Sequence, residues 1–356
     1  MHKKLFIPGP TEVSADVLEK MSTPMIGHRT KEATALQKNI SENLQKLFFT
    51  ESDILLSTSS GTGLMEGAVR SCTAKRAAVF SIGSFGTRWH KMAVQNGVEA
   101  DLFEAEDGFH TDPSLVDDVL KTGKYDLVTI THNETSAGLA NPCEEIGEVL
   151  KNYPDVVYCV DAVSSAGGMK IDTDKWGIDV CITSTQKCLA LPPGLAVCTF
   201  SDKAIERAGS VKNRGYYLDL LMVHENMKKN FQYPSTPSLA HMFALDYKLD
   251  QIVNNEGIEN RFARHKEMAD YVRAWAKEKF EIFPEEQYAS DTITCIKNTR
   301  EIDVAALCSE LNNLGYEISN GYGKLVEKTF RIAHMGDLTL DDVKELLSTI
   351  DKVLSI

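Results

Sequence analysis

The segment DVCITSTQKCLALPPG, residues 179–194, decides how the chain is interpreted. Its apolar residues 180–182 predict a short strand, which four polar residues and then Lys187 follow. The run of residues 192–194, Pro-Pro-Gly, fixes the backbone and prevents a helix from continuing. A lysine that a stiff loop holds at a strand end loses its proton readily and can attack a carbonyl. The alternative is one solvated lysine among many, and this segment alone leaves both open.

Short apolar runs alternate with helical spacing on either side of this segment. Strands are predicted at 54–56, 77–82, 125–131, 156–160, 180–183 and 195–200, and helices at 30–49, 64–74, 88–96 and 143–152. This alternation predicts a mostly parallel sheet with helices on both faces. In such sheets the ligand lies beyond the carboxyl ends of the strands.

The pattern in the rest of the chain predicts a connecting helix and a second, smaller α+β domain. Residues 1–13 should be extended, 209–237 should form long loops, a helix should run from Ser238 through 256–280, and strands at 291–297 and 329–333 should alternate with helices at 302–314 and from Thr339 onward. Thr339 and Asp342 form a capping-box pattern. We therefore divide the chain into an N-terminal segment (1–13), a large domain (14–245) and a small C-terminal domain (246–356).

Composition excludes several classes of protein. The formal net charge of the 356 residues is −13, which argues against a nucleic acid or an anionic membrane as partner. The eight cysteines form no C-x-x-C pair, and we interpret them as core residues in a reducing compartment, with no metal site. No apolar run has the length of a signal peptide or a membrane span. A cytoplasmic location is expected.

The other polar motifs also follow predicted strands. SSGTG, residues 59–63, precedes a helix whose free N–H groups would favour a phosphate, although it could be an ordinary tight turn. It is neither a Walker A loop nor a G-x-G-x-x-G motif. Phe85, between two glycines, offers a flat face for stacking on a ring, or it could fold into the core. Residues 131–136, THNETS, are a polar run that plain loops also contain.

Asp161 closes the apolar run 156–160. A carboxylate there is costly unless something pairs with it, either a protonated ring nitrogen or the N–H groups of the following turn. Four features follow successive predicted strands: an amine, a carboxylate, a loop that could bind phosphate and an aromatic ring. Together they predict a pyridoxal 5'-phosphate site. Lys187 would form the Schiff base, and Asp161 would keep the pyridine nitrogen protonated. Arg331, in a predicted strand, suits an amino-acid carboxylate, unless it is simply exposed.

With these motifs in this order, the chain resembles the class V aminotransferases of fold type I over essentially its whole length. The resemblance rests on PGPTEV (8–13), SSGTG (59–63), GSFGTRW (83–89), THNETSAG (131–138), VDAVSSAGG (160–168), STQKCLALPPG (184–194) and FRIAHMG (330–336). The alanine/serine–glyoxylate (serine–pyruvate) aminotransferases are the nearest group.

The resemblance implies a role for each matching position. Lys187 would carry the cofactor and the proton, Asp161 would pair with the pyridine nitrogen, Phe85 and Val163 would flank the ring, Thr135 would lie near its phenolic oxygen, and Thr62, Gly63 and Gln186 would hold the phosphate. Tyr233 and Thr236 would reach the neighbouring subunit's phosphate, which implies an obligate homodimer. Arg331 would bind the substrate carboxylate, and Gly9 would border the substrate.

Two positions depart from the family pattern. Leu64 stands where some relatives place a histidine, which removes one polar contact with the phosphate. Phe85 replaces the tryptophan of many relatives and gives a smaller stacking surface.

The predicted reaction is a ping-pong transamination from alanine or serine to glyoxylate or pyruvate. A phosphoserine- or aspartate-type transaminase is an alternative; for phosphoserine, the pair His28-Arg29 is the only nearby cationic candidate. A cysteine desulfurase or lyase would need a cysteine on a mobile loop, whereas Cys295 and Cys308 lie in strand and helix patterns. A cofactor-free binding protein is a third possibility. Pocket shape decides the donor, and one sequence does not reveal it.

Overall fold

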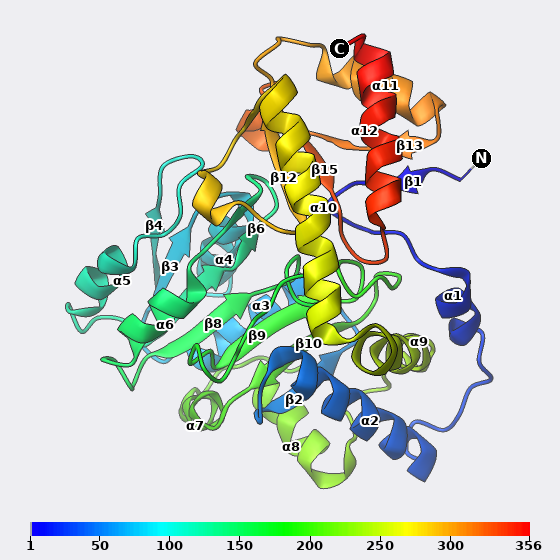
Figure 1. Cartoon of the computed structure of the whole chain (residues 1–356). Coiled ribbons are helices and arrows are strands. Elements are labelled where there is room, and N and C mark those ends of the chain that lie inside the picture. Colours follow the sequence, from blue (N-terminus) through cyan, green and yellow to red (C-terminus); the bar gives the residue numbers. More distant parts are fainter. Residues whose placement is uncertain (1) are drawn as a thin grey trace.

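A seven-stranded sheet forms the centre of the computed structural model, which describes residues 2–356 (Figure 1). Its strand order is β2 (Asp53–Ser57), β10 (Ala196–Phe200), β9 (Val180–Ser184), β8 (Val157–Asp161), β5 (Leu127–Thr131), β3 (Ala77–Ser81) and β4 (Ala100–Glu104). Within this sheet β10 alone runs against its neighbours. The predicted fold class, a mostly parallel α/β sheet, is confirmed.

Both faces of the sheet are buried. One is covered by α2 (Lys31–Phe48), α5 (Pro113–Leu120), α6 (Cys143–Leu150) and α9 (Leu239–Asp250), the other by α3 (Gly61–Cys72), α4 (Ser84–Gln95), α7 (Asp202–Ser210) and α8 (Leu220–Asn230). Within β2, Ile54 and Leu56 join the first core and Leu55 joins the second, as the two-residue period of a strand requires. Burial on both faces explains why the strands are continuous apolar runs.

The C-terminal part is built on a smaller antiparallel sheet. Its order is β11 (Glu281–Ile282), β12 (Ile293–Lys297), β15 (Thr329–Ala333) and β14 (Ser319–Asn320), with α10 (Ile258–Lys279), α11 (Val304–Asn313) and α12 (Leu340–Leu354) packed on it. Thr339 and Asp342 form the predicted capping box of α12. The N-terminal strand β1 (Lys4–Leu5) pairs with β13 (Tyr316–Glu317), so the chain start is attached to this part.

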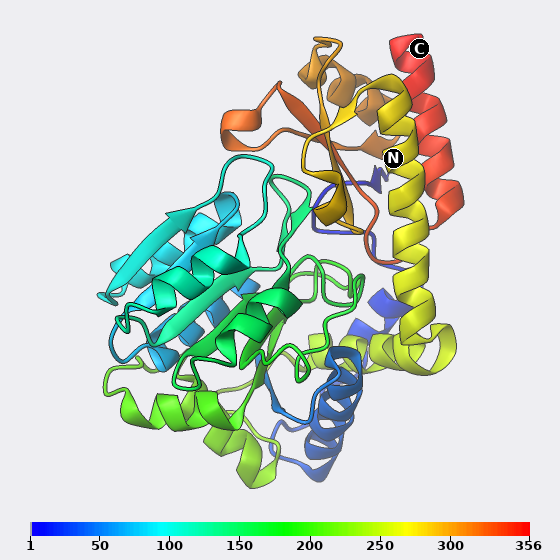
Figure 2. The ribbon, with the colours of Figure 1, turned by 60° about the vertical axis from the view of Figure 1, so that its left-hand side comes forward.

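The remaining short elements are α1 (Ala15–Met21), β6 (Asn133–Glu134), β7 (Leu139–Ala140) and two 3₁₀ turns, Glu286–Tyr288 and Gly323–Leu325. Between α9 and α10 lies a π-helical segment, Gln251–Glu256, which Gly257 ends with a φ of +84°. Figures 1 and 2 show α10 running along one side of the molecule, from α9 to the small sheet. The domain limits at residues 13 and 245 stay predictions.

Three predictions of local structure were wrong. Residues 209–237 are not all loop, because α8 lies within them, with the Asp219 side chain capping its first N–H groups. At the candidate site α3 begins at Gly61 instead of Leu64, and α4 at Ser84 instead of Arg88. Glycines have low helix propensity, so those in the first turns of α3 and α4 hid both helix starts.

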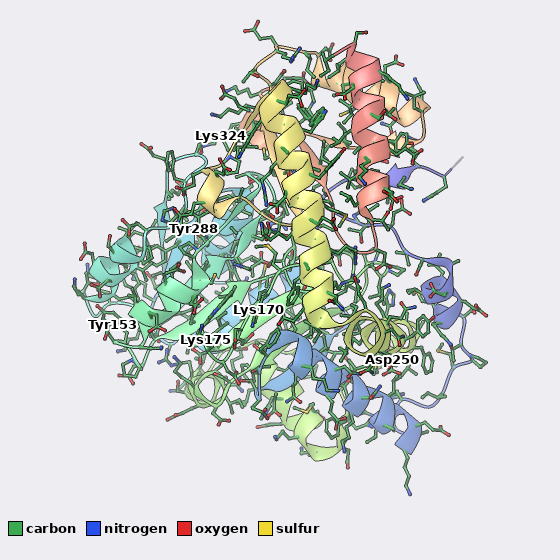
Figure 3. All side chains as sticks on the ribbon, in the orientation of Figure 1. Tyr153, Lys170, Lys175, Asp250, Tyr288 and Lys324 are labelled. Carbon is green, nitrogen blue, oxygen red and sulfur yellow. The ribbon has the colours of Figure 1, made fainter. Side chains whose placement is uncertain are left out.

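Several ion pairs lie on the outside of this framework. Lys175 pairs with Glu144 across 2.6 Å, and Lys324 pairs with Asp107 across 2.6 Å (Figure 3). Seven cysteines are buried and Cys308 is partly buried, all with free thiols. No helix in residues 2–356 combines the length and the apolar character that crossing a bilayer requires.

Candidate active site

A cavity of about 140 Å³ lies beyond the carboxyl ends of the parallel strands. Asp161 is the last residue of β8, and Lys187 follows the end of β9 by three residues. The cavity brings together seven residues of the predicted site, namely Thr62, Phe85, Thr135, Asp161, Val163, Gln186 and Lys187. They come from five separate segments, so the fold gathers them as the strand-end rule predicts.

Lys187 lies in a loop that the N-terminal segment covers. The hydroxyl of Thr11 donates to the carbonyl oxygen of Lys187 over 3.0 Å, and the amine of Lys187 donates to the carbonyl oxygen of Pro8. Gly9 has a φ of +106°, and a Cβ there would lie 2.6 Å from the Lys187 amine. Only glycine therefore suits this position, which borders the amine.

Burial lowers the pKa of Lys187 to about 8. The charge of the Asp161 carboxylate raises it, and the charges of Arg331 and Arg88 lower it further. A solvated lysine keeps a pKa near its ordinary value, so this environment differs from that of a surface lysine. An appreciable fraction of the amine is neutral, and hence nucleophilic, in mildly alkaline solution.

Asp161 is the buried carboxylate opposite this amine, with 5% of its surface exposed. Its Oδ1 accepts a hydrogen bond of 2.9 Å from the Val163 N–H, so it does stabilise the following turn. No other hydrogen bond within residues 2–356 reaches its carboxylate. Burial raises its pKa to about 6. A cationic ring nitrogen beside Oδ2 would offset that desolvation.

The first turn of α3 forms the other end of the cavity. The N-cap residue Ser60 makes no side-chain capping bond, which leaves first-turn N–H groups for an anion. A Cβ on Gly61 would lie 2.5 Å from the Val163 side chain, so glycine allows the helix start to approach the cavity. Gly63 does not line the cavity; its α-carbon faces Ser59.

Three buried polar atoms in the cavity wall have no hydrogen-bond partner among residues 2–356. They are Asn133 Oδ1, Ser184 Oγ and Gln186 Oε1. Each such atom costs about 1–3 kcal/mol unless something satisfies it. Together with a flat Phe85, a helix N-terminus and a buried carboxylate, they fit a polar, phosphorylated ring such as pyridoxal 5'-phosphate.

Sequence reasoning missed Arg88, which also lines this cavity. Its Nη1 donates to the Thr62 hydroxyl over 3.2 Å, and its guanidinium carbon lies 4.6 Å from the centre of the Phe85 ring. Arg88 follows Phe85 by three residues on α4, and residues so spaced share one helix face. A correctly placed helix start at Ser84 would have revealed it.

Sequence reasoning also missed the role of Glu134. Its buried carboxylate accepts from the N–H groups of Phe85 (2.9 Å) and Gly86 (3.0 Å), which fixes the first turn of α4. Burial raises the pKa of Glu134. The polar run 131–136 therefore contains a group that orients the predicted stacking ring.

Arg331 lies on β15 beside the cavity but does not line it. Only 5% of its surface is exposed, so the alternative interpretation of Arg331 as an ordinary surface arginine is excluded. Its Nη1 donates to the carbonyl oxygen of Thr135 (3.1 Å), while Nε and Nη2 donate to that of Asn320 (3.1 and 3.0 Å). A guanidinium has five N–H donors, so two remain for a ligand.

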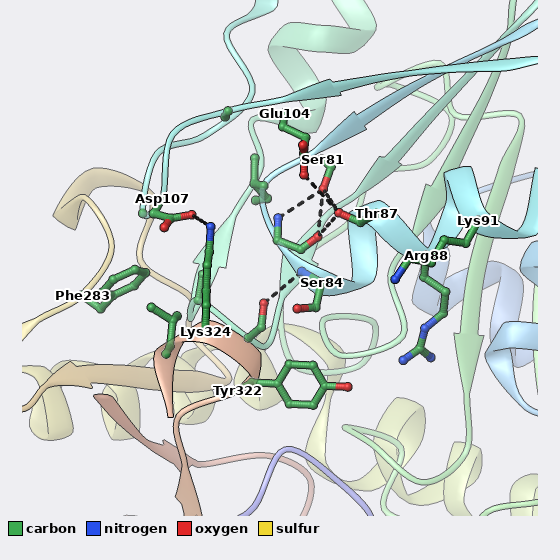
Figure 4. Close-up of a pocket in the computed structure, with 17 residues that line it drawn as sticks. Ser81, Ser84, Thr87, Arg88, Lys91, Glu104, Asp107, Phe283, Tyr322 and Lys324 are labelled. Carbon is green, nitrogen blue, oxygen red and sulfur yellow. Dashed lines mark hydrogen bonds and ion pairs between the residues drawn. The ribbon is translucent and has the colours of Figure 1, made fainter. Parts of the chain in front are cut away.

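A second cavity, of about 560 Å³, adjoins the first (Figure 4). Arg88 lines both cavities. The Tyr322 ring forms part of its wall, 5.9 Å from that of Phe85, and the Lys324–Asp107 ion pair lies at its edge. This larger space lies between α4 and residues 322–325, which follow β14 of the small sheet.

Tyr233 and Thr236 do not line the Lys187 cavity within one chain. Tyr233 is buried and its hydroxyl has no partner among residues 2–356, whereas Thr236 is exposed. Their predicted contact with a neighbouring subunit stays a prediction.

The cysteines contribute no candidate nucleophile at this site. Cys295 is fully buried in β12, burial raises its pKa to about 12, and Cys308 lies on α11. A desulfurase cysteine would need exposure and a lowered pKa. Among residues 2–356 no cluster of three His, Cys, Asp or Glu side chains is arranged to hold a metal.

Comparisons with known proteins agree with this geometry. Residues 5–355 match the model of the aminotransferase class-V family. An uncharacterized aminotransferase of Methanocaldococcus jannaschii is 41% identical, covering 98% of this chain and 91% of that protein. The serine–glyoxylate aminotransferase of Methylorubrum extorquens is 32% identical, covering 94% and 86%. The L-aspartate–glyoxylate aminotransferase of Paracoccus denitrificans is 30% identical, covering 94% and 87%.

Solved structures show the same fold. The crystal structure of alanine–glyoxylate aminotransferase from Nostoc sp. superposes with a TM-score of 0.94 at 26% identity, covering 99% of this chain and 96% of that one. Two predictions, fold type I and the transaminase reaction class, are thus confirmed. The family depends on pyridoxal 5'-phosphate and acts on amino acids and oxo acids. The chain belongs to the class-V aminotransferase family.

Proposed function

We propose that this transaminase takes its amino group from alanine or serine and passes it to glyoxylate, with pyruvate as the other candidate acceptor. The relatives support glyoxylate, because serine–glyoxylate, L-aspartate–glyoxylate and alanine–glyoxylate aminotransferases differ in donor and share this acceptor. One observation carries the proposal: a buried amine with a lowered pKa and a buried carboxylate with one unengaged oxygen line the same cavity.

Pyridoxal 5'-phosphate, when bound, supplies a ring that accepts the electrons released from the substrate's α-carbon. Lys187 would hold the cofactor through its amine and would then carry the proton between substrate and cofactor. Its lowered pKa suits a group that must gain and lose a proton near neutrality. Asp161 would pair with the ring nitrogen and keep it protonated.

The remaining cavity residues would bind and orient the cofactor. Phe85 and Val163 would lie on opposite faces of the ring, and Thr135 near its phenolic oxygen. Thr62, Gln186 and the first-turn N–H groups of α3 would hold the phosphate. The role expected of Gly63 is less well supported, because Gly63 does not line the cavity and its N–H donates to the carbonyl oxygen of Ser60. The Gln186 amide oxygen, which is buried without a hydrogen-bond partner among residues 2–356, supports the presence of a ligand at the phosphate end of the cavity.

Arg331 would bind the α-carboxylate of the substrate with its two unused N–H donors. Gly9 would border the substrate, since no side chain fits between that segment and the amine. Both residues come from the part of the chain attached to the small sheet.

A homodimer would complete the site. The exposed Thr236 supports a contact outside the single chain, whereas the Tyr233 hydroxyl is buried within it and would have to become accessible in the dimer. In this arrangement each subunit would hold its neighbour's cofactor phosphate. A cytoplasmic location fits the eight free thiols.

An acidic donor is the second candidate. The relative that acts on L-aspartate and the cationic side chains Arg88 and Lys91 in the adjoining cavity favour it, whereas Lys324 there is already paired with Asp107. For phosphoserine, Arg29 is already engaged by Gln232 and the carbonyl of Tyr233. The desulfurase alternative lacks a reactive cysteine, as described above.

A half-reaction screen tests the proposal. The cofactor-loaded enzyme is mixed with each amino acid in turn, and conversion to the pyridoxamine form is followed by absorbance. Alanine or serine should convert the enzyme fastest, and glyoxylate should reverse the conversion. Rapid conversion by aspartate and not by alanine or serine would reject the proposed donor.

A further inference from the structure

Arg261 is a fully buried cation behind the candidate active site, and no role assigned so far includes it. It lies in the first turns of α10, with 1% of its surface exposed. Its Nε donates to the carbonyl oxygen of Gly167 (2.9 Å), and its Nη2 to that of Cys188 (2.6 Å). Cys188 directly follows Lys187, and Gly167 lies in the turn that follows Asp161.

One side chain therefore connects the two backbone segments that present the amine and the carboxylate. These segments also pack directly, because a Cβ on Gly167 would lie 3.2 Å from the Leu189 side chain. Without the guanidinium, the buried carbonyl oxygens of Gly167 and Cys188 would lose these hydrogen-bond donors. A planar guanidinium can reach both carbonyls at once, whereas a lysine ammonium acts as a single point of charge.

The other side of Arg261 faces the junction between the domains. Its Nη1 pairs with Glu256 (2.6 Å), the last residue of the π-helical segment, and its Nη2 lies 3.3 Å from Asp337 of the small domain. Asp337 also binds Lys248 of α9 across 2.5 Å. Figure 3 labels Asp250, which ends α9 directly before this segment. π-Helical segments are frequent at functional sites.

We propose that Arg261 is a positioning residue for Lys187, which holds the 185–191 loop against the turn after Asp161 and joins both to the interdomain helix α10. The inference rests on the proposed role of Lys187. It predicts that changing Arg261 displaces the amine from its working geometry without touching the cofactor or the substrate.

Arg264 provides a matched control. It lies on the same helix, pairs with Glu256 across 2.7 Å and donates to the carbonyl oxygen of Gly336 (3.0 Å). No hydrogen bond joins it to the 162–169 turn or the 185–191 loop among the described residues. A general loss of junction stability should therefore appear in Arg264→Gln as well as in Arg261→Gln, whereas a change in how the bound ring is held should appear in Arg261→Gln alone.

The experiment compares full-length R261Q, R261K and R264Q with the parent enzyme, each loaded with cofactor. Thermal unfolding checks the fold, visible circular dichroism reports how the bound ring is held, and single-turnover mixing with an amino acid separates the maximal rate from the apparent Kd. R261Q should lower the maximal rate by up to about 100-fold and change the visible dichroism, with the Kd little altered. R261K should lie between R261Q and the parent.

Equal rates and equal dichroism for R261Q and R264Q would overturn the inference. If R261Q does not fold, the same rates and dichroism are compared between R261K and R264K, and equal values would again overturn the inference. Borohydride reduction of the parent enzyme keeps the two proposals apart. If the parent carries a pyridoxyl group on Lys187 while R261Q behaves as R264Q does, only the positioning role fails. If the parent carries none there, the proposed function itself fails.

Discussion

The Nη1 of Arg331 donates a hydrogen bond to the backbone carbonyl oxygen of Thr135 across 3.1 Å. This contact joins β15 of the small sheet to the segment that follows β5 of the central sheet. The predicted carboxylate-binding arginine is thereby fixed relative to the cofactor cavity, although it does not line that cavity. The relative position of the two domains would then determine where the substrate's carboxylate lies.

Arg331→Lys should lower kcat/KM for the amino donor by roughly 10- to 100-fold, mainly through a higher KM. A lysine cannot hold Thr135 and Asn320 and still offer two parallel donors to a carboxylate. Steady-state kinetics with the best donor measures this. Arg300→Lys, on the outside of the small domain, is the control and should match the parent. An unchanged kcat/KM in R331K would exclude the assigned role.

Arg88→Gln should weaken cofactor binding by about tenfold, because a cation beside the predicted phosphate-binding Thr62 is removed. Titration of the apoenzyme with pyridoxal 5'-phosphate, followed by fluorescence, gives the Kd. Lys91→Gln, one turn further along α4, tests whether any positive charge near the cavity matters. Equal affinities of R88Q and the parent would show that Arg88 does not act on the cofactor.

Asp161→Asn should slow the first half-reaction by roughly 10- to 100-fold, since the protonated ring nitrogen would lose a charged partner. Asparagine can still accept the hydrogen bond from Val163, so the turn should persist. Stopped-flow absorbance gives the rate, and circular dichroism checks the fold. A rate like the parent's would mean that the carboxylate serves the turn alone.

The stability of the apoenzyme should depend on pH through Lys187. Its folded pKa of about 8 lies below the ordinary value of 10.5, so the folded state binds fewer protons between those two pH values. The contribution of Lys187 to stability therefore rises as pH increases from 8 to 10.5 and is least favourable below 8. Relative to Lys187→Met, the parent should gain on the order of 1 kcal/mol across this window. Denaturant unfolding at several pH values measures the difference, and a constant difference would contradict a buried amine.

Much of the site could be predicted because its chemistry lies at strand ends. Lys187 and Asp161 follow clear apolar runs, and parallel strands bring their carboxyl ends to one edge. The same rule placed Thr135 and Thr62 near them. Local sequence was sufficient to predict a cavity residue wherever a strand was followed by an unusual polar residue.

The rest depends on packing between distant segments. Arg88 was missed because glycines obscured the start of α4, and Arg261 because it acts from a helix in the other half of the chain. The contact of Gly9 with the Lys187 amine joins residues 178 positions apart, which no local pattern reveals. The roles proposed for Tyr233 and Thr236 involve a second subunit, and a single sequence does not show how two subunits meet.

Borohydride reduction tests the central claim most directly. The enzyme is loaded with pyridoxal 5'-phosphate, reduced, digested and analysed by mass spectrometry, with Lys187→Met treated in parallel. The account predicts a phosphopyridoxyl group on the peptide that contains Lys187, and none on the corresponding peptide of the variant. Modification of a different lysine in the parent enzyme, with Lys187 unmodified, would contradict it.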